Sequence, residues 1–559
     1  MTKTLLIASF VLSSLLGFAQ ELTIAIPEHR FRIDPYNNIV VIQRQNLDDY
    51  ADLSGYSEIE LELSGFEFSF VDIPTSLEYT GGYTINNGSE NYNLFFTRLP
   101  LLKIQSQGNI ENEPKIPAQF LYADEDQIII STIGIERRGA ISQSYPKNTY
   151  DIEFWEDETG EVKVDVQIGN MRNDDDWILD GMYNEPLRIR AHSAMQLWLE
   201  IHEPHYISLH PNAKSGAKSQ YVELFLNGRY TGIYLISEQI DRKLLEVLPF
   251  EGEIEGELYK GEDFGEASTF ELLPDFDNSS RIWSDYEMKY PDESDTTNWQ
   301  NLYDFTDFVM NSSEDEFENI WSKFSLDNYI DYFIFLNTIR AGDNIGKNIY
   351  TGRYSSDMPY FYVPWDLDGC FGTKWDGTVQ NITDDILANG FHERVITSNV
   401  NNYWQTVRQR WYELRPNILH PDSLIERLQQ SFDLLKANNV YTRESLVFPN
   451  YPYDQESFDY TATWINERIE FLDIYFDYNP TGISEISGSG LTLYPNPVHD
   501  KFWIDFKPDL SNQPYQIIDI SGKVTASGIY NGNPIPVYGI EKGLYIFKLG
   551  NLTEKIIIQ

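Results

Sequence analysis

The apolar residues of this 559-residue chain change their spacing about halfway along it. Up to about residue 260 they form short β-rich runs, including the segment YVELFLNGRYTGIYLISEQID, whose Asn227-Gly228 suits a type I′ turn and predicts a hairpin. From residue 301 onwards helical spacing takes over, in NLYDFTDFVM, SLDNYIDYFIFLNTI, YWQTVRQRWYELRPNIL and SLIERLQQSFDLLKANN. We expect Ser325, and either Asp422 or Ser423, to cap two of these helices. The order predicts an α+β chain in which strands precede helices.

Composition divides the chain further. Residues 1–20 combine one Lys, an apolar run and a small residue, which predicts a signal peptide cleaved near Ala19 or Gln20. Residues 21–126 are a β-rich N-terminal region, and 127–476 form the main domain, with an acidic stretch at 261–300 expected to be a long loop or insertion. DYNPTGISEISGSG at 477–490 is a linker, and 491–559 predict a small Ig-like β-sandwich.

Charge and cysteine content limit the possible partners. The chain has 87 acidic residues against 41 Lys and Arg, a formal charge of −46, which argues against nucleic acid or an anionic membrane surface. It favours cations or a basic protein substrate, although taken alone it is more often a solvated acidic surface without a specific partner. Cys370 is the only cysteine, so an intramolecular disulfide is excluded. No second run of 18 apolar residues follows the first 20, so no transmembrane segment is expected in the mature chain.

Three polar residues stand at suggestive intervals within the helical half. Asp343 precedes Asn348 by five positions in GDNIGKNIY, and Asp366 follows in VPWDLDG. Phosphoryl transfer needs an Asp to accept or align a hydroxyl proton, and hard oxygen ligands for a divalent metal. The trio satisfies both needs, but an Asp-x4-Asn spacing by itself is weak evidence because it arises often by chance.

Longer motifs at both ends resemble known families. The tail, with LTLYPNPVHDKFWI, YQIIDISGKV and GLYIFKLGNLTEKIIIQ, resembles the C-terminal sorting domain of the type IX (Por) secretion system. That resemblance implies handling by the type IX machinery, passage through the outer membrane, and release or attachment at the cell surface.

ERRGAISQSYPKNTYDIEF, DDDWILDGMYNEPLRIRAHSAMQLW, the hairpin segment, GDNIGKNIY and YFYVPWDLDGCFG resemble, in that order, the CotH kinase family of spore-coat-type atypical kinases. The resemblance runs from roughly Ile129 to Phe371 and more loosely to about Phe476. It implies a distant kinase-like fold, ATP with Mg²⁺ or Mn²⁺ as cofactors, and phosphorylation of protein serines.

The resemblance also assigns roles to individual residues. Asp343 would be the catalytic Asp, and Asn348 and Asp366 would be metal ligands. Asp368 would be an outer ligand or simply a turn residue before Gly369. The residues implied for the nucleotide are Arg138 and Lys147 for the phosphates, Glu238 as the partner of Lys147, and Tyr360 for stacking on adenine, although Lys147 also fits a surface lysine and Tyr360 a core position.

These observations favour a secreted kinase that phosphorylates Ser or Thr of an extracytoplasmic protein. The alternative is a cell-surface binding or structural protein that keeps a kinase-like scaffold without turnover. A third hypothesis is polysaccharide binding by residues 21–126 through exposed aromatic side chains. The run Asp174-Asp175-Asp176 also admits a calcium site, but it lacks the other ligands of an EF-hand loop.

Overall fold

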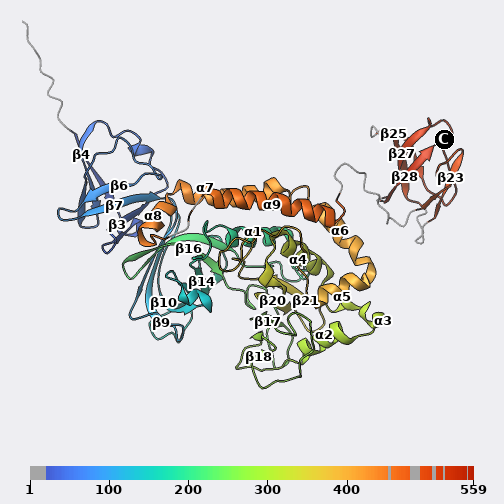
Figure 1. Cartoon of the computed structure of the whole chain (residues 1–559), viewed down its shortest axis with the longest axis horizontal. Helices are drawn as coiled ribbons and strands as arrows, with labels where there is room; N and C mark the ends of the chain where they lie inside the picture. Colours follow the sequence, from blue (N-terminus) through green and yellow to red (C-terminus); the bar gives the residue numbers. More distant parts are fainter. Residues whose placement is uncertain are drawn as a thin grey trace, which may run out of the picture. The chain divides into compact units, whose positions relative to one another are not determined.

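The computed structural model describes residues 20–450, 453, 455–478, 492–505, 512–519, 523–550 and 552–558. The predicted signal peptide, except for Gln20, and most of the linker lie outside these ranges. The chain divides into two compact units, Met1–Phe476 and Asp477–Gln559 (Figure 1). Both helices and strands are present, and most strands of the first unit precede its helices, which confirms the α+β class.

A seven-stranded sheet begins the first unit, in the order β1-β4-β5-β6-β7-β3-β2. In β4 the exposed Glu58, Glu60 and Glu62 alternate with buried apolar residues that form one core. The other face contributes Ile39 and Val41 to a second core against the neighbouring barrel, which explains why β3 is apolar on both faces. The strands are β1 (Gln20–Ile26), β2 (Phe31–Asp34), β3 (Ile39–Gln43), β4 (Tyr56–Leu63), β5 (Phe66–Phe70), β6 (Tyr83–Asn86) and β7 (Asn91–Thr97).

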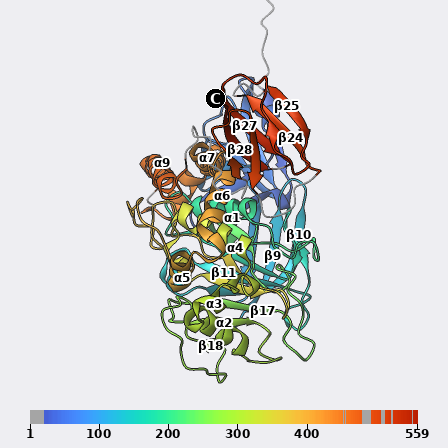
Figure 2. The same cartoon turned by 90° about the vertical axis from the view of Figure 1, so that its right-hand side faces the viewer.

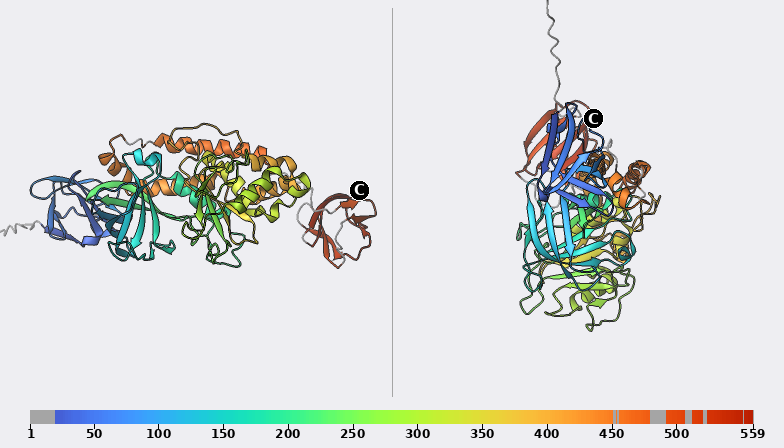
Figure 3. Two further views of the ribbon diagram at one scale, coloured as in Figure 1. Left: turned by 90° about the horizontal axis from the view of Figure 1, so that it is seen from below. Right: turned by 90° about the vertical axis from the view of Figure 1, so that its left-hand side faces the viewer.

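A closed barrel follows, with the strand order β10-β11-β14-β16-β15-β8-β9 (Figures 1 and 3). The predicted hairpin is confirmed as β15–β16, with positive φ at both Asn227 and Gly228. The boundary predicted between residues 126 and 127 falls inside the β9–β10 hairpin of this barrel. The strands are β8 (Leu101–Ser106), β9 (Ile116–Ala123), β10 (Ile128–Arg138), β11 (Thr149–Trp155), β14 (Asp176–Asp180), β15 (Ser219–Leu226) and β16 (Arg229–Glu238), with the short pair β12 (Val166–Gln167) and β13 (Asn173–Asp174) beside them.

A five-stranded sheet, β18-β19-β17-β20-β21, forms the next layer. The acidic stretch at 261–300 is not only a loop, because it contains a β18–β19 hairpin turning at Ser284 and Asp285, both with positive φ. That hairpin is hard to recognise from sequence because β18 has only two residues. The strands are β17 (Glu257–Gly261), β18 (Ile282–Trp283), β19 (Tyr286–Tyr290), β20 (Ile349–Arg353) and β21 (Tyr360–Pro364).

Helices cover this sheet and part of the barrel (Figures 1 and 2). Ser325 caps α4, as predicted, and α4 is buried almost throughout its length against β21. The cap of α7 is His420 rather than Asp422 or Ser423, because Pro421 occupies the first helical position. The helices are α1 (Arg190–Ile201), α2 (Gln300–Asn311), α3 (Glu314–Phe317), α4 (Leu326–Ile339), α5 (Gly390–Ser398), α6 (Tyr403–Leu414), α7 (Pro421–Ala437), α8 (Val440–Val447) and α9 (Gln455–Tyr475).

The second unit consists of two small sheets, β22-β23-β26 and β25-β24-β27-β28. Phe502 of one sheet and Phe547 of the other meet edge to face in a shared core, as expected for a β-sandwich. Its strands are β22 (Thr492–Tyr494), β23 (Lys501–Asp505), β24 (Pro514–Asp519), β25 (Val524–Ile529), β26 (Ile535–Pro536), β27 (Gly543–Leu549) and β28 (Leu552–Ile558). Across the described residues of both units, none of the helices combines the length and apolar character needed to cross a membrane.

Candidate functional site

The β20–β21 hairpin explains the interval between Asn348 and Asp366. Asn348 directly precedes β20, and Asp366 lies two residues beyond the end of β21. Antiparallel pairing therefore returns the chain to its starting point, and the Trp365 N–H donates to the Asn348 carbonyl at 3.0 Å. The Asn348 side-chain amide then donates to Asp366 Oδ2 at 3.3 Å. Both residues have positive φ, the conformation that Asn and Asp tolerate best after Gly.

Further carboxylates gather around this pair. The pKa of Asp366 is raised, chiefly by loss of solvation and then by the nearby charge of Asp180, although its side chain is open to solvent. The pKa of Asp368 is raised well above its ordinary value by burial and by Asp366, with Asp180 and Asp343 adding to the effect. Four negative groups thus act on one another in a small volume, and a cation bound among them would relieve that repulsion.

Asp343 lies in the turn Gly342–Ile345 that joins α4 to β20. Burial raises the pKa of its carboxyl, Lys347 lowers it, and Asp263 raises it. The Asn344 side chain fixes this turn from within by donating to the carbonyls of Asn348 (2.7 Å) and Trp365 (2.8 Å). The loop carrying Asp343 is therefore tied to the same hairpin ends that carry the other site residues.

Arg138 is the cation best placed to meet an anionic ligand at this cluster. It ends β10, is half-buried, and its guanidinium lies 5.3 Å from the centre of the Trp365 ring. It lowers the pKa of Asp366, so the two charges are close. Within the described parts of the chain, its guanidinium has no hydrogen-bond partner. Lys260, which also acts on Asp366, already binds Glu262 at 2.6 Å.

Lys147 does not pair with Glu238, which corrects the sequence-based expectation. Its ammonium group binds Glu444 of α8 and the Ile233 carbonyl, and the side chains of both charged residues are completely buried. Glu444 also accepts from Arg188 Nε at 3.3 Å and from the Ile233 N–H at 3.0 Å. Burial lowers the pKa of Lys147 to about 8, whereas Lys147 and Arg188 together lower that of Glu444 despite its burial.

Glu238 instead accepts hydrogen bonds from backbone N–H groups. Its carboxylate accepts the backbone N–H groups of Arg172 (2.6 Å) and Lys218 (2.8 Å), which holds it away from Lys147.

Tyr360 lies in the hydrophobic core, which was the second interpretation of its position in the sequence. It does not lie at the acidic cluster. It is 4% exposed, packs on the Phe305 ring at 4.9 Å, and donates its hydroxyl to the buried Glu257 at 2.7 Å. A buried ring whose hydroxyl is already bonded has no face available for an adenine base.

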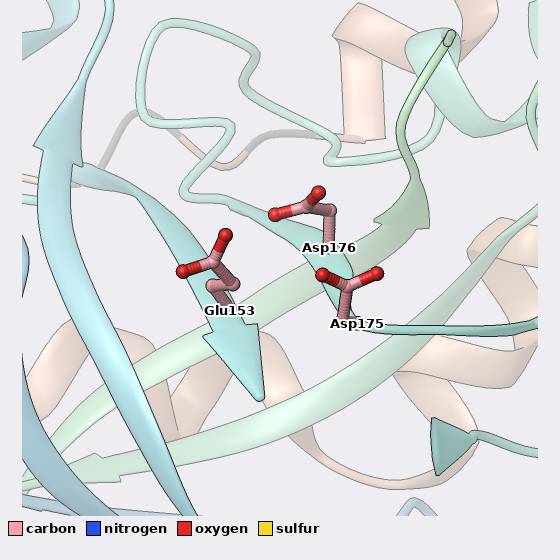
Figure 4. Close-up of side chains that lie close together, drawn as sticks. All are labelled: Glu153, Asp175 and Asp176. Atoms are coloured by element: carbon pink, nitrogen blue, oxygen red, sulfur yellow. The ribbon is translucent and has the colours of Figure 1, made fainter. Parts of the chain in front are cut away.

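A second acidic cluster lies on the barrel, where Glu153, Asp175 and Asp176 converge (Figure 4). Burial and neighbouring carboxylates raise the pKa of Asp176 to about 6. Lysine side chains form ion pairs with these carboxylates. Lys163 binds Glu153, and Lys243 binds Asp174 (2.8 Å) and Asp175. Lys115 lies 3.7 Å from Asp176. Because ammonium groups balance this cluster, we assign it to barrel stability rather than to calcium.

Sequence reasoning missed three residues of the site region: Asp180, Asn184 and Glu444. Asp180 follows the apolar run of β14 directly, a position typical of functional carboxylates, and Asn184 donates to Asp368 Oδ2 at 2.7 Å. Both lie inside the quoted segment DDDWILDGMYNEP, so their proximity to the motif was visible. For Glu444 no local signal exists, since it is 297 residues from Lys147.

The first unit thus joins a β-barrel to a helix-covered sheet, and Asp343, Asn348 and Asp366 lie in one turn and at the two ends of the hairpin that follows it. The family model described as "CotH kinase protein" matches residues 135–472, more than half of the chain. The chain therefore belongs to the CotH kinase family. A second model, "Secretion system C-terminal sorting domain", matches residues 492–559, and it indicates type IX secretion to the cell surface or beyond. No curated protein matched the chain.

Proposed function

We propose that this secreted protein transfers the γ-phosphate of ATP to Ser or Thr of an extracytoplasmic protein. The observation that carries the proposal is the carboxylate cluster at the hairpin ends. Asp366 has an exposed side chain that accepts from the Asn348 amide, and its pKa is raised by loss of solvation and then by the charge of Asp180. A scaffold without turnover has no need to keep mutually repelling carboxylates together, whereas a metal–nucleotide site does.

The ligand chemistry of the cluster suits Mg²⁺ or Mn²⁺. The amide oxygen of Asn348 and the carboxylates of Asp366 and Asp368 are hard oxygen ligands, and together they carry two charges, which is the number a Mg²⁺ site commonly uses. When bound, the ion supplies charge neutralisation for the transferred phosphoryl group. Asn184 orients Asp368 by donating to one of its oxygens, which leaves the other available.

We assign the remaining roles in the reaction to Asp343, Arg138 and Lys147. Asp343, with its raised pKa, is positioned to accept the proton of the acceptor hydroxyl. The Arg138 guanidinium, held against Trp365, binds the phosphates. Lys147 has no exposed side-chain atoms, so its contribution is to fix the loop between β10 and β11, which follows Arg138.

The test is thermal unfolding of the full chain with ATP, with and without Mn²⁺, followed by transfer of labelled phosphate to protein acceptors. We expect a metal-dependent rise in melting temperature that is lost in Asp366→Ala, because a ligand that binds only the folded state stabilises it. Asp327→Ala is the matched control, since Asp327 is an exposed residue in the first turn of α4.

The outcomes separate the two functional hypotheses. Loss of the shift in Asp366→Ala but not in Asp327→Ala, with transfer in the parent, supports the kinase. No shift in any of the three proteins refutes the nucleotide site and favours the non-catalytic surface protein.

A further inference from the structure

One segment connects the acidic cluster with the turn that carries Asp343. We call it the return segment: residues 369–389, which run from the residue after Asp368 to the start of α5. Near its beginning, the Asn184 side chain donates both to Asp368 Oδ2 (2.7 Å) and to the Trp375 carbonyl. The return segment is therefore tied to the cluster where it begins.

The last residue of the return segment binds the end of the Asp343 turn, Gly342–Ile345. The Asn389 side-chain amide donates to the Ile345 carbonyl at 2.8 Å. The oxygen of the same side chain accepts the His392 N–H at 3.1 Å and so caps α5. One polar side chain thus fixes the distance between the first turn of α5 and the end of the Asp343 turn.

Arg340 binds the return segment at the other end of the turn. It follows the last residue of α4 with a φ of 54°, a left-handed conformation that Gly or Asn usually takes at a helix end. Its Nε and Nη2 donate to the two oxygens of Asp385 at 2.8 and 2.6 Å, and Nη1 donates to Gln380 Oε1 at 2.8 Å. These bonds offset the strain of the backbone and hold the chain where it enters the Asp343 turn.

The partner of Arg340 is itself firmly placed. The buried Arg468 of α9 donates to the carbonyls of Asn337 (2.7 Å) and Asp385 (2.6 Å), and the Asn337 side chain exchanges two hydrogen bonds with the Leu387 backbone, at 3.1 and 2.8 Å. Partial burial raises the pKa of Asp385, but the hydrogen bond and charge of Arg340, together with Arg468, lower it below its ordinary value. Asp385 is therefore an ionised group on a fixed backbone.

Building on the kinase function proposed above, we propose that the Arg340–Asp385 pair and Asn389 are positioning residues that hold Asp343 beside Asp366. The cluster cannot do this by itself, because its carboxylates repel one another and push the turn away. The ties to the return segment act against that repulsion from both ends of the turn. A proton acceptor needs such support, since a small displacement of its carboxylate lowers the rate strongly.

Hydrogen exchange of the full chain without ligands tests the position of the turn directly. The peptide that spans residues 341–348 contains the amides of Asn344 (3.1 Å) and Lys347 (3.0 Å), each of which donates to a carbonyl of the same loop. Asp385→Asn keeps the shape of the side chain but removes its charge. We expect about three- to tenfold faster exchange of this peptide in the variant, because the turn opens more often.

The matched control is Asp473→Asn. Asp473 binds Arg415 with the same geometry, Nε to Oδ1 at 2.9 Å and Nη2 to Oδ2 at 3.0 Å, but this pair joins α6 to α9. Its loss should leave the exchange of residues 341–348 unchanged. Arg340→Gln should match Asp385→Asn, and the double variant should add little to either, because the two side chains act as one pair.

Phosphate transfer supplies a measurement that a merely structural role would not change. Asp343 meets the acceptor hydroxyl rather than the nucleotide. In Asp385→Asn the transfer rate at saturating ATP and Mn²⁺ should therefore fall about tenfold, while the ATP concentration that gives half of the maximal rate stays the same. Asp473→Asn should change neither quantity.

Three outcomes would overturn the proposal: unchanged exchange in Asp385→Asn, equally faster exchange in Asp473→Asn, or faster exchange in Asp385→Asn with an unchanged transfer rate. If the parent shows no metal-dependent shift with ATP, the kinase function fails instead. The exchange of residues 341–348 then still decides whether the Arg340–Asp385 pair holds the turn.

Discussion

Replacing Glu444 by Gln tests the buried charge network that joins α8 to the barrel. The substitution keeps the shape and leaves one oxygen for the Ile233 N–H, but it removes the carboxylate that binds both Lys147 and Arg188. Breaking a fully buried ion pair costs about 3–5 kcal/mol. Because Lys147 already has a pKa near 8 and can release its proton, we expect the lower end, about 3 kcal/mol. For a unit of this size that corresponds to a melting temperature lower by about 3 °C.

The sign of the pH dependence gives a second check. The pKa of Lys147 is lower in the folded chain than the ordinary value of 10.5, so the unfolded chain binds this proton more readily and stability rises between about pH 8 and 10.5. Without Glu444 the pKa of Lys147 in the folded chain falls further. The additional loss of stability from protonating Lys147 is therefore confined to pH below about 8. The difference in free energy of unfolding between the parent and Glu444→Gln should therefore decrease from pH 7 to pH 9.

The assay is denaturant unfolding of the full chain, followed by tryptophan fluorescence, at pH 7 and 9. The control is Glu467→Gln, an exposed carboxylate on α9. A loss below about 1 kcal/mol at pH 7, or a loss equal to that of the control, would refute the reasoning, because a solvated carboxylate would lose no more.

Three further results are expected. Asp366→Asn should raise the melting temperature of the metal-free protein, because loss of solvation, and then the charge of Asp180, raise the pKa of Asp366, so that its ionised form destabilises the fold at neutral pH; an unchanged or lower value would contradict this. Gly232→Ala should destabilise the chain by about 1–3 kcal/mol in denaturant unfolding, since its φ is +91° and a Cβ atom would collide with the Glu444 carboxylate; tolerance of Ala would show that the network can shift. Adding Ca²⁺ should shift the melting temperature of Glu153→Gln and of the parent equally, because lysines balance that cluster, and a shift specific to the parent would identify a metal site.

Much of the candidate site was predictable because it is local. Asp343, Asn348 and Asp366 lie within one loop and one hairpin, and strands adjacent in sequence pair without help from the rest of the chain. Asp180 could have been added, since it ends a short strand, directly after the apolar residues 177–179, inside a recognised segment. Tyr360 could not be placed from sequence, because an aromatic residue in a strand fits a core and a ligand surface equally well.

The sequence by itself determined the α+β order, the Asn227-Gly228 hairpin, the Ser325 cap and the separation of the sorting tail. Each depends on residues near one another in the chain, where turn chemistry and side-chain periodicity act directly. Only the tertiary structure decided that β8 closes the barrel against β15 and that Glu444, not Glu238, binds Lys147. Both are contacts between distant segments, and the balance between burial and charge pairing that selects them exists only once the chain has folded.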